Sequence, residues 1–231
     1  MHLLCPITLS SFLSSAMAEI PVQDLLWEKY IAADKDLVDE WNSKTTEEQT
    51  DVAELAFRVE RDQLIRVQVL EIAQQHNGNP KDAGPLYAQV IKQMKQIDAE
   101  NSAWIKKHIH QHGWFTISAY GEEASSNAFL LVQHSTSDVQ FMTAVLTQLE
   151  TLWPIGEVLP SDYAMLYDRV NRKNNGHQRY GTQMRCTNGT MVLAAPLEDT
   201  KTVDVLRSQV SLEPLEVYRA SLTVAYGCGA Q

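Results

Sequence analysis

The side chains best suited to chemistry gather in two short segments late in the chain. One is Asp168-Arg169, and the other is the run Gln178-Arg179-Tyr180-Gly181-Thr182-Gln183. Together they place a carboxylate, arginines, carboxamides, a phenol and a hydroxyl around one glycine. Because a buried polar group costs free energy unless it is paired, this concentration predicts either a hydrogen-bonded network or a ligand-binding site.

His134 is the candidate acid–base residue. It follows Gln133 at the end of a helix predicted over residues 122–134, and histidine can accept and return a proton near neutral pH. We expect Asp168 to orient His134, and Arg169 to hold an anionic group with its planar guanidinium. The structural alternatives are a histidine that complements the helix dipole and two surface charges that meet neighbouring helices.

The run from Gln178 to Gln183 is predicted to be a strand. Alternation along a strand would then place polar side chains on both faces, so neither face suits a hydrophobic core. Gly181 fits a position where a ligand or another backbone approaches closely. The side chains expected to contact a ligand are Gln133, Gln178, Tyr180, Thr182 and Gln183.

A second group of polar residues is the histidine series His108, His110 and His112. On a helix, His108 and His112 share a face, which is the spacing of zinc-binding histidine pairs. No glutamate follows His108 in the His-Glu-x-x-His pattern, and Lys106 and Lys107 oppose the binding of a cation. We therefore expect neither a metal site nor a cofactor.

The start of the chain predicts export. Residues 1–18 contain a short apolar run that ends in Ala16-Met17-Ala18, a small-x-small cleavage pattern. The run is too short to span a bilayer comfortably, although the lack of Lys or Arg before it leaves a retained anchor or a buried cytosolic segment as alternatives. We expect a cleaved signal peptide and a periplasmic or secreted protein that begins near Glu19.

Composition narrows the partners of residues 19–231, which we expect to form a single helical domain. The chain has 231 residues and a net charge of −10, so it is a poor partner for nucleic acid, and no later segment is expected to cross a membrane. A small molecule or a cell-envelope polymer is the ligand expected, and the sequence leaves protein partners open. Cys186 and Cys228 would survive cleavage, and their spacing leaves open whether they pair.

Apolar periodicity predicts a mainly α-helical domain with one small antiparallel β-hairpin in the C-terminal third. The expected helices cover residues 22–41, 45–75, 86–110, 122–134, 138–153, 160–172, 203–210 and 214–222. Extended runs over residues 178–186 and 191–195 flank Asn188-Gly189. Because both residues of that pair tolerate positive φ, they favour a tight hairpin turn.

The order of short motifs resembles a bacterial family of unknown function over roughly residues 51–218. The motifs are Asp62-Gln63-x-x-Arg66, Asp98-x-x-Asn101, Gly113-Trp114, Gly121-Glu122, Gln133-His134, Tyr163-Ala164-x-Leu166-x-Asp168-Arg169, Gln178-x-Tyr180-Gly181-Thr182-Gln183 and Leu197-Glu198-Asp199. The chain departs from the family at Phe115, where a proline is usual, and at Ser211–Pro214, where Gly-Leu-Pro is usual. The resemblance implies no particular activity.

Three functions fit these residues, and the sequence leaves open whether the protein is an enzyme. The first is an exported protein with a polar pocket, a hydrolase of a small or polymeric polar ligand in which His134, Asp168 and Arg169 are catalytic. The second is a non-enzymatic binding module in which the same polar residues form a structural network. The third is a cell-wall glycosidase with Glu122 as acid, which would need a second carboxylate about 5–10 Å away.

Overall fold

The computed structural model describes residues 22–76 and 80–229. The predicted signal peptide over residues 1–18 lies outside the described residues. The elements, in chain order, are α1 (Val22–Ser43), α2 (Asp51–Gln75), the 3-10 helix η1 (Pro80–Ala83), α3 (Pro85–His112), α4 (Ile117–Tyr120), α5 (Glu122–His134), α6 (Val139–Leu152), the 3-10 helix η2 (Trp153–Ile155), α7 (Pro160–Asn174), β1 (Met184–Thr187), β2 (Thr190–Leu193), α8 (Val203–Gln209) and α9 (Leu215–Ala225).

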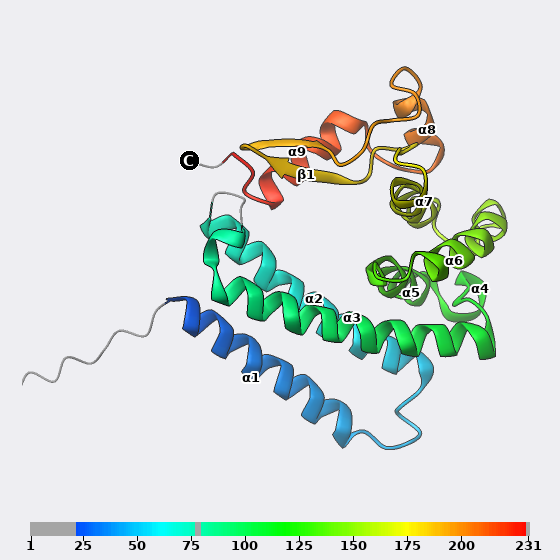
Figure 1. Ribbon diagram of the computed structural model, residues 1–231. Helices are drawn as coiled ribbons and strands as arrows, with labels where there is room; N and C mark the ends of the chain where they lie inside the picture. The colour runs from blue at the N-terminus through cyan, green and yellow to red at the C-terminus, as the bar shows by residue number, and fades with distance from the viewer. Residues whose placement is uncertain (1–21, 77–79, 230–231) are drawn as a thin grey trace, which may run out of the picture.

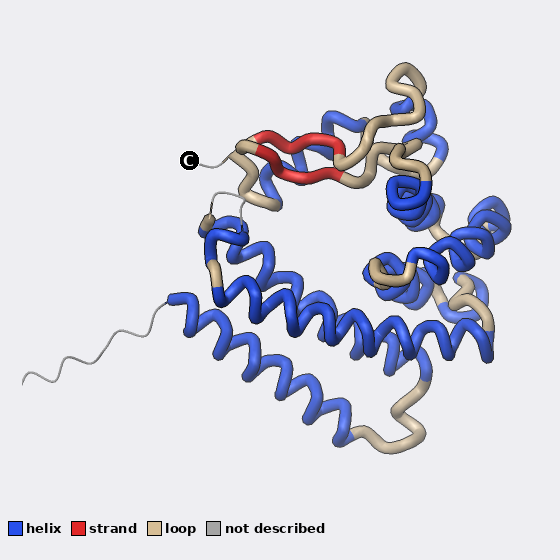
Figure 2. The backbone as a smooth tube through the Cα atoms, viewed as in Figure 1, coloured by secondary structure: helices blue, strands red, loops and turns tan. Residues whose placement is uncertain are grey.

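The expected fold class is confirmed, since the described residues are mainly helical with a single two-stranded antiparallel hairpin. Helices α1, α2 and α3 run alternately up and down as one layer, and α5 packs on α2 and α3 (Figure 1). The strands lie together with α9 across from the first layer, as Figure 2 shows in red and blue. No helix in the described part of the chain is long and apolar enough to cross a membrane.

Three apolar clusters lie among the described residues, and two of them hold the helices from α1 to α7 together. One joins the first three helices through buried side chains such as Tyr30, Ile65 and Val90. The larger one joins α2 and α3 to α5, α6 and α7 around Ile105 and Leu131. Because apolar residues recur at helical spacing on each of these helices, each helix buries one face. The packing of α5 on α2 then places the end of α5 beside α2.

Side-chain caps explain two helix starts. Asp138 caps α6 by accepting a hydrogen bond from the Phe141 amide, 2.9 Å away, which fits the predicted start at residue 138. The predicted start of the second helix at residue 45 is wrong. The Thr50 hydroxyl caps the Ala53 amide, so α2 begins at Asp51, and residues before it form a turn instead.

The hairpin turn is confirmed, because Asn188 and Gly189 have φ of 50° and 70°. The predicted length of the first strand is wrong, since β1 begins at Met184 and the residues before it are irregular apart from a bridge at Gln178. The amides of Arg179, Tyr180, Thr182 and Gln183 bond to side chains, whereas the amide of Gln178 donates to the Pro196 carbonyl at the bridge. A disulfide between Cys186 and Cys228 joins β1 to the end of the chain after α9, which answers the question that spacing left open.

Candidate functional site

Asp168 binds backbone and not His134. Its side chain lies on α7, is fully buried, and accepts hydrogen bonds from the amides of Arg179 at 2.7 Å, Tyr180 at 3.0 Å and Thr182 at 2.8 Å. Burial raises the pKa of Asp168, and these amides oppose the rise. The expectation that Asp168 orients His134 is therefore wrong, because both carboxylate oxygens already hold the segment that follows α7.

Gln178 and Tyr180 also help to hold the segment after α7 in place, and neither residue lines the cavity described below. The Gln178 carboxamide is fully buried; it donates to the carbonyl of Ala195 at 2.9 Å and accepts from the Gln183 amide at 2.7 Å. The Tyr180 carbonyl accepts a 2.6 Å hydrogen bond from the buried guanidinium of Arg207. These contacts explain why both faces of the segment looked polar.

Gly181 is required by the same segment for a steric reason. Its φ is +67°, a conformation that side chains other than glycine rarely adopt. A Cβ atom there would lie 2.8 Å from Cδ1 of Leu215 and 3.2 Å from Cδ2 of Leu197. Protein side chains, and not a ligand, therefore lie close to Gly181, and the absence of a side chain there lets Leu215 of α9 pack against the segment.

The carboxylate that contacts His134 belongs to Asp62 of α2. Nδ1 of His134 lies 2.9 Å from Oδ2 and 3.1 Å from Oδ1 of that carboxylate. Asp62 is fully buried, while the His134 side chain at the end of α5 is 13% exposed. The helix-end position of His134 therefore places its ring between a buried carboxylate and a more open space.

Arg66 connects this pair to a second carboxylate. Its Nε and Nη2 atoms each lie 3.1 Å from an oxygen of Asp62, and Nη2 also contacts Asp98 of α3. Burial alone would raise the pKa of Asp62, but hydrogen bonds and charge from His134 and Arg66 bring it below its usual value. Burial raises the pKa of Asp98 to about 6, and the charge of Asp62 adds to the rise.

Burial of His134 favours the neutral form of its ring. Burial lowers its pKa, and the nearby Arg66 and Arg169 add to the decrease, whereas Asp62 opposes it. A neutral ring with its proton on Nδ1 donates to Asp62, which leaves the lone pair on Nε2. Nε2 has no hydrogen-bonding partner among the residues that the structure describes, and the ring lines a cavity. This is the arrangement of a general base held by a carboxylate.

The cavity has a volume of about 430 Å³ and lies among α2, α5, α7, the hairpin and α9. Figure 1 shows the arrangement of these elements, with the hairpin and α9 across from α2 and α3. Of the residues predicted to act on a ligand, the structure brings His134, Arg169, Gln133, Thr182 and Gln183 to this cavity.

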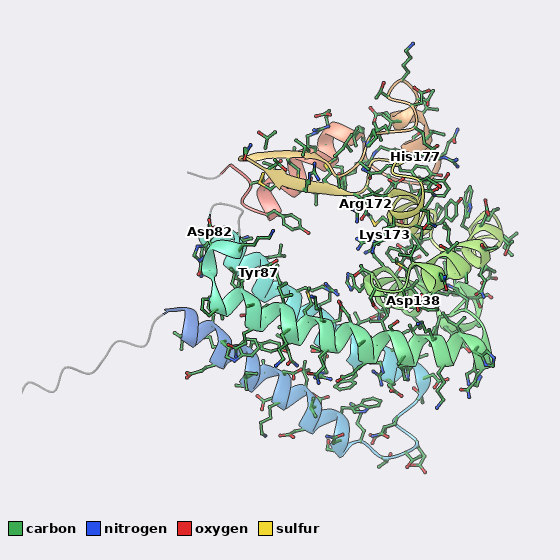
Figure 3. The ribbon with its side chains drawn as sticks, viewed as in Figure 1. Asp82, Tyr87, Asp138, Arg172, Lys173 and His177 are labelled. Carbon is green, nitrogen blue, oxygen red and sulfur yellow. A yellow bond between two sulfur atoms is a disulfide. The ribbon has the colours of Figure 1, made fainter. Side chains whose placement is uncertain are left out.

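Arg169 is a cation without an acidic partner among the residues described. It lies on α7, and its Nε atom is buried without a hydrogen bond. Burial lowers the pKa of Arg169 to about 10, and the charges of Arg172 and Arg66 add to the decrease, so the group is still charged at neutral pH. Lys173 also follows Arg172 on this helix (Figure 3). An uncompensated cation at a cavity is suited to bind an anion.

A metal ion does not fit the His134 end of the cavity. Ligand atoms of Asp62, Asp98 and His134 lie within 4.8 Å of one another, which is close enough for shared coordination. The guanidinium of Arg66, however, hydrogen-bonds both carboxylates. Because that guanidinium already occupies oxygens of both carboxylates and would repel a second cation, these residues do not suit a metal ion.

Asp62, Arg66 and Asp98 were named from the sequence only as parts of family motifs, and not as site residues. Asp62 carried a detectable signal, because it falls on the buried stripe of α2 between Val59 and Ile65. A carboxylate at a core-facing position needs a partner from another element. Glu122, the alternative glycosidase acid, begins α5 as an exposed first-turn residue and does not line the cavity.

The fold and site define a mainly α-helical protein with a histidine–aspartate pair at a polar cavity. The chain belongs to the family of unknown function DUF6624, whose profile matches residues 50–231. A comparison with curated proteins found no match, and neither did a comparison with solved structures.

Proposed function

We propose that this protein is an exported hydrolase that acts on a polar ligand carrying an anionic group. The observation that carries the proposal is that His134 and Arg169 line the same cavity. One residue can move a proton, and the other is a cation that lacks a partner among the described residues. The cavity volume of about 430 Å³ suits a small molecule or one unit of a polymer.

In the proposed reaction, Nε2 of His134 removes a proton from water while the water attacks the bond to be cleaved. The carboxylate of Asp62 stabilises the imidazolium that forms, because its Nδ1 contact becomes an ion pair. His134 then returns the proton to the leaving group. Water is the proposed nucleophile, since the cysteine at the cavity, Cys186, is bonded to Cys228.

Arg169 would hold the anionic group of the ligand beside His134. Its planar guanidinium can donate two parallel hydrogen bonds to a carboxylate or phosphate. Thr182, Gln183 and Tyr218 line the same cavity and add hydroxyl and carboxamide groups. The resulting fixed orientation of the ligand is what would allow water and leaving group to meet a single histidine.

A non-enzymatic binding module is the second candidate. It is favoured by Asp168, Gln178 and Tyr180, whose polar groups serve the fold and not the cavity. In that case Arg169 would bind the anion, and His134 with Asp62 would only join α5 to α2.

One experiment separates the two candidates. Melting temperatures of the purified chain are measured with phosphate, sulfate and citrate, and turnover is measured with chromogenic phosphate, sulfate and carboxylate esters. A ligand that binds the folded state raises the melting temperature. We expect Arg169→Gln to abolish that rise, and His134→Gln to keep it while lowering turnover about 100-fold or more.

Lys95→Gln is the matched control for the loss of charge, because Lys95 is an exposed cation on α3 away from the cavity lining. Anion binding without turnover of any ester would support the binding module. Equal turnover by His134→Gln and the unmodified chain would contradict the hydrolase, and an unchanged melting temperature with every anion would contradict both candidates.

A further inference from the structure

A second group of histidines lies outside the cavity, where α2 begins and α3 ends. His108 and His112 lie one turn apart near the end of α3, and their ring centroids are 5.0 Å apart. Asp51 is the first residue of α2. Because α2 and α3 run antiparallel, these two ends are neighbours (Figure 1). The carboxylate that the sequence around the histidines lacks is thus supplied by another helix.

The geometry points to a Zn²⁺ site formed by Asp51, His108 and His112. The ligand atoms of these side chains lie within 4.8 Å of one another. Nδ1 of His108 is 3.2 Å from Oδ2 of Asp51. Two ligands of a tetrahedral zinc ion, each at about 2.0–2.1 Å, are separated by about 3.3 Å. The His108 Nδ1 and Asp51 Oδ2 atoms are therefore already at the required separation. Rotation of the exposed His112 side chain would bring its imidazole to the same ion.

The surroundings of His108 hold one ligand in place. Its ring is 4% exposed and stacks on Phe115 with centroids 3.9 Å apart. Its Nε2 atom is buried and has no hydrogen-bonding partner among the described residues, so Asp51 is the polar contact that its ring makes.

The other ligands leave room for water or substrate. Asp51 and His112 are exposed, and the site opens into a hollow of about 240 Å³ that Glu54 and Lys107 also line. Glu54 is paired with Arg58, and Lys107 is exposed, so its long side chain can keep its charge in solvent away from the ion. Two imidazoles, one carboxylate and open positions form a donor set that suits zinc among the abundant divalent ions.

Binding at this site would join two helix ends that are far apart in the chain. The site is separate from the proposed hydrolase, because none of its three ligands lines the other cavity. Zinc would therefore stabilise the α2–α3 pair by binding the folded chain. The site does not depend on the proposed reaction, and its test needs no substrate.

The test uses the full chain without a polyhistidine tag, after treatment with a chelator. Calorimetry with ZnCl₂ is expected to give one equivalent bound, together with a rise in melting temperature. Asp51→Asn and His112→Gln are expected to weaken binding about 100-fold or more. Both residues are exposed, so these variants fold even if a His108 variant does not. Titration with Co²⁺ should give the visible absorption of a tetrahedral ion.

His110→Gln is the matched control, since His110 lies on the same helix, is exposed, and is not one of the clustered ligands. It should bind zinc as the unmodified chain does. The inference is overturned if the unmodified chain binds no zinc, or if Asp51→Asn and His112→Gln bind as tightly as it does. It is also overturned if His134→Gln alone removes binding, which would place zinc at the cavity.

Discussion

Nδ1 of His134 lies 2.9 Å from Oδ2 of Asp62, across 72 positions of sequence. One residue ends α5 and the other lies in the middle of α2, so only the packing of these helices creates the pair. His134 therefore contacts Asp62 and not the predicted partner Asp168, and the two carboxylates have different roles. Asp62 serves the histidine at the cavity, and Asp168 serves the backbone after α7.

Replacing Asp62 with Asn should lower the pKa of His134. The Asp62 carboxylate favours the charged imidazolium, against burial and the nearby arginines. Its removal should lower the histidine pKa by about 1 pH unit or more. NMR titration of the ring nitrogens measures this, with His134→Gln used to assign the signal. An unchanged or higher pKa would show that Asp62 does not govern His134.

Replacing Asp168 with Asn should destabilise the fold without affecting His134. The new amide would direct its N–H groups at the backbone amides of Arg179, Tyr180 or Thr182. Leaving such buried donors unpaired should cost about 3 kcal/mol or more in the free energy of unfolding, measured in urea. Asp39→Asn, at an exposed position, should cost little. A shifted His134 titration in Asp168→Asn would contradict the separate roles.

Asp162 should make stability fall as pH rises. Burial raises the pKa of Asp162 to about 6, so between about 4 and 6 the folded state binds more protons than the unfolded state, and stability decreases with pH. Asp162→Asn removes this effect while keeping an acceptor for the Ser126 hydroxyl. The variant should equal the unmodified chain near pH 4 and exceed it above pH 6, by on the order of 1–3 kcal/mol.

Asp199→Asn provides a control of opposite sign for that experiment. Hydrogen bonds from the Lys201 amide and the Thr202 hydroxyl lower the pKa of Asp199. Its charged form stabilises the fold above the unfolded pKa, and this contribution is lost as pH falls. The Asn variant should therefore be the less stable chain at neutral pH. Parallel pH profiles for both variants would contradict these assignments.

Removing the disulfide should destabilise the chain. Cys186 and Cys228 close a loop with a sequence separation of 42, so replacing both with Ser should lower the free energy of unfolding by about 4 kcal/mol through the entropy of the unfolded chain. Thermal melts with and without dithiothreitol measure the effect. The double variant should no longer respond to the reductant. Equal melting temperatures for all four samples would show that the bond does not stabilise the fold.

Features set by neighbouring residues could be predicted from the sequence. The Asn188-Gly189 turn, the Asp138 cap and the α5 boundaries depend on contacts within a few positions. Their stereochemistry is local, so pattern and turn chemistry are sufficient. At the start of α2 two local signals competed, and the predicted start at residue 45 was wrong because Thr50 provides the cap.

The candidate site could be predicted only in part. His134 and Arg169 stood out by residue type, because a histidine and an arginine near other polar groups indicate proton transfer and anion binding. The partner of His134 could not be predicted. The expected carboxylate, Asp168, accepts hydrogen bonds from amides of the segment that follows α7. The same amides explain why residues 178–183 are irregular and not a strand.

By itself, then, the sequence determined the helices, the hairpin turn and the polar residue types, all through interactions of short range. The tertiary structure decided which carboxylate meets His134, that Arg169 lacks a partner among the described residues, and that Asp51 joins the histidines of α3. Each of these pairings depends on how whole helices pack. Burial and distance between remote segments, and not local preference, then set the charge and proton affinity of each group.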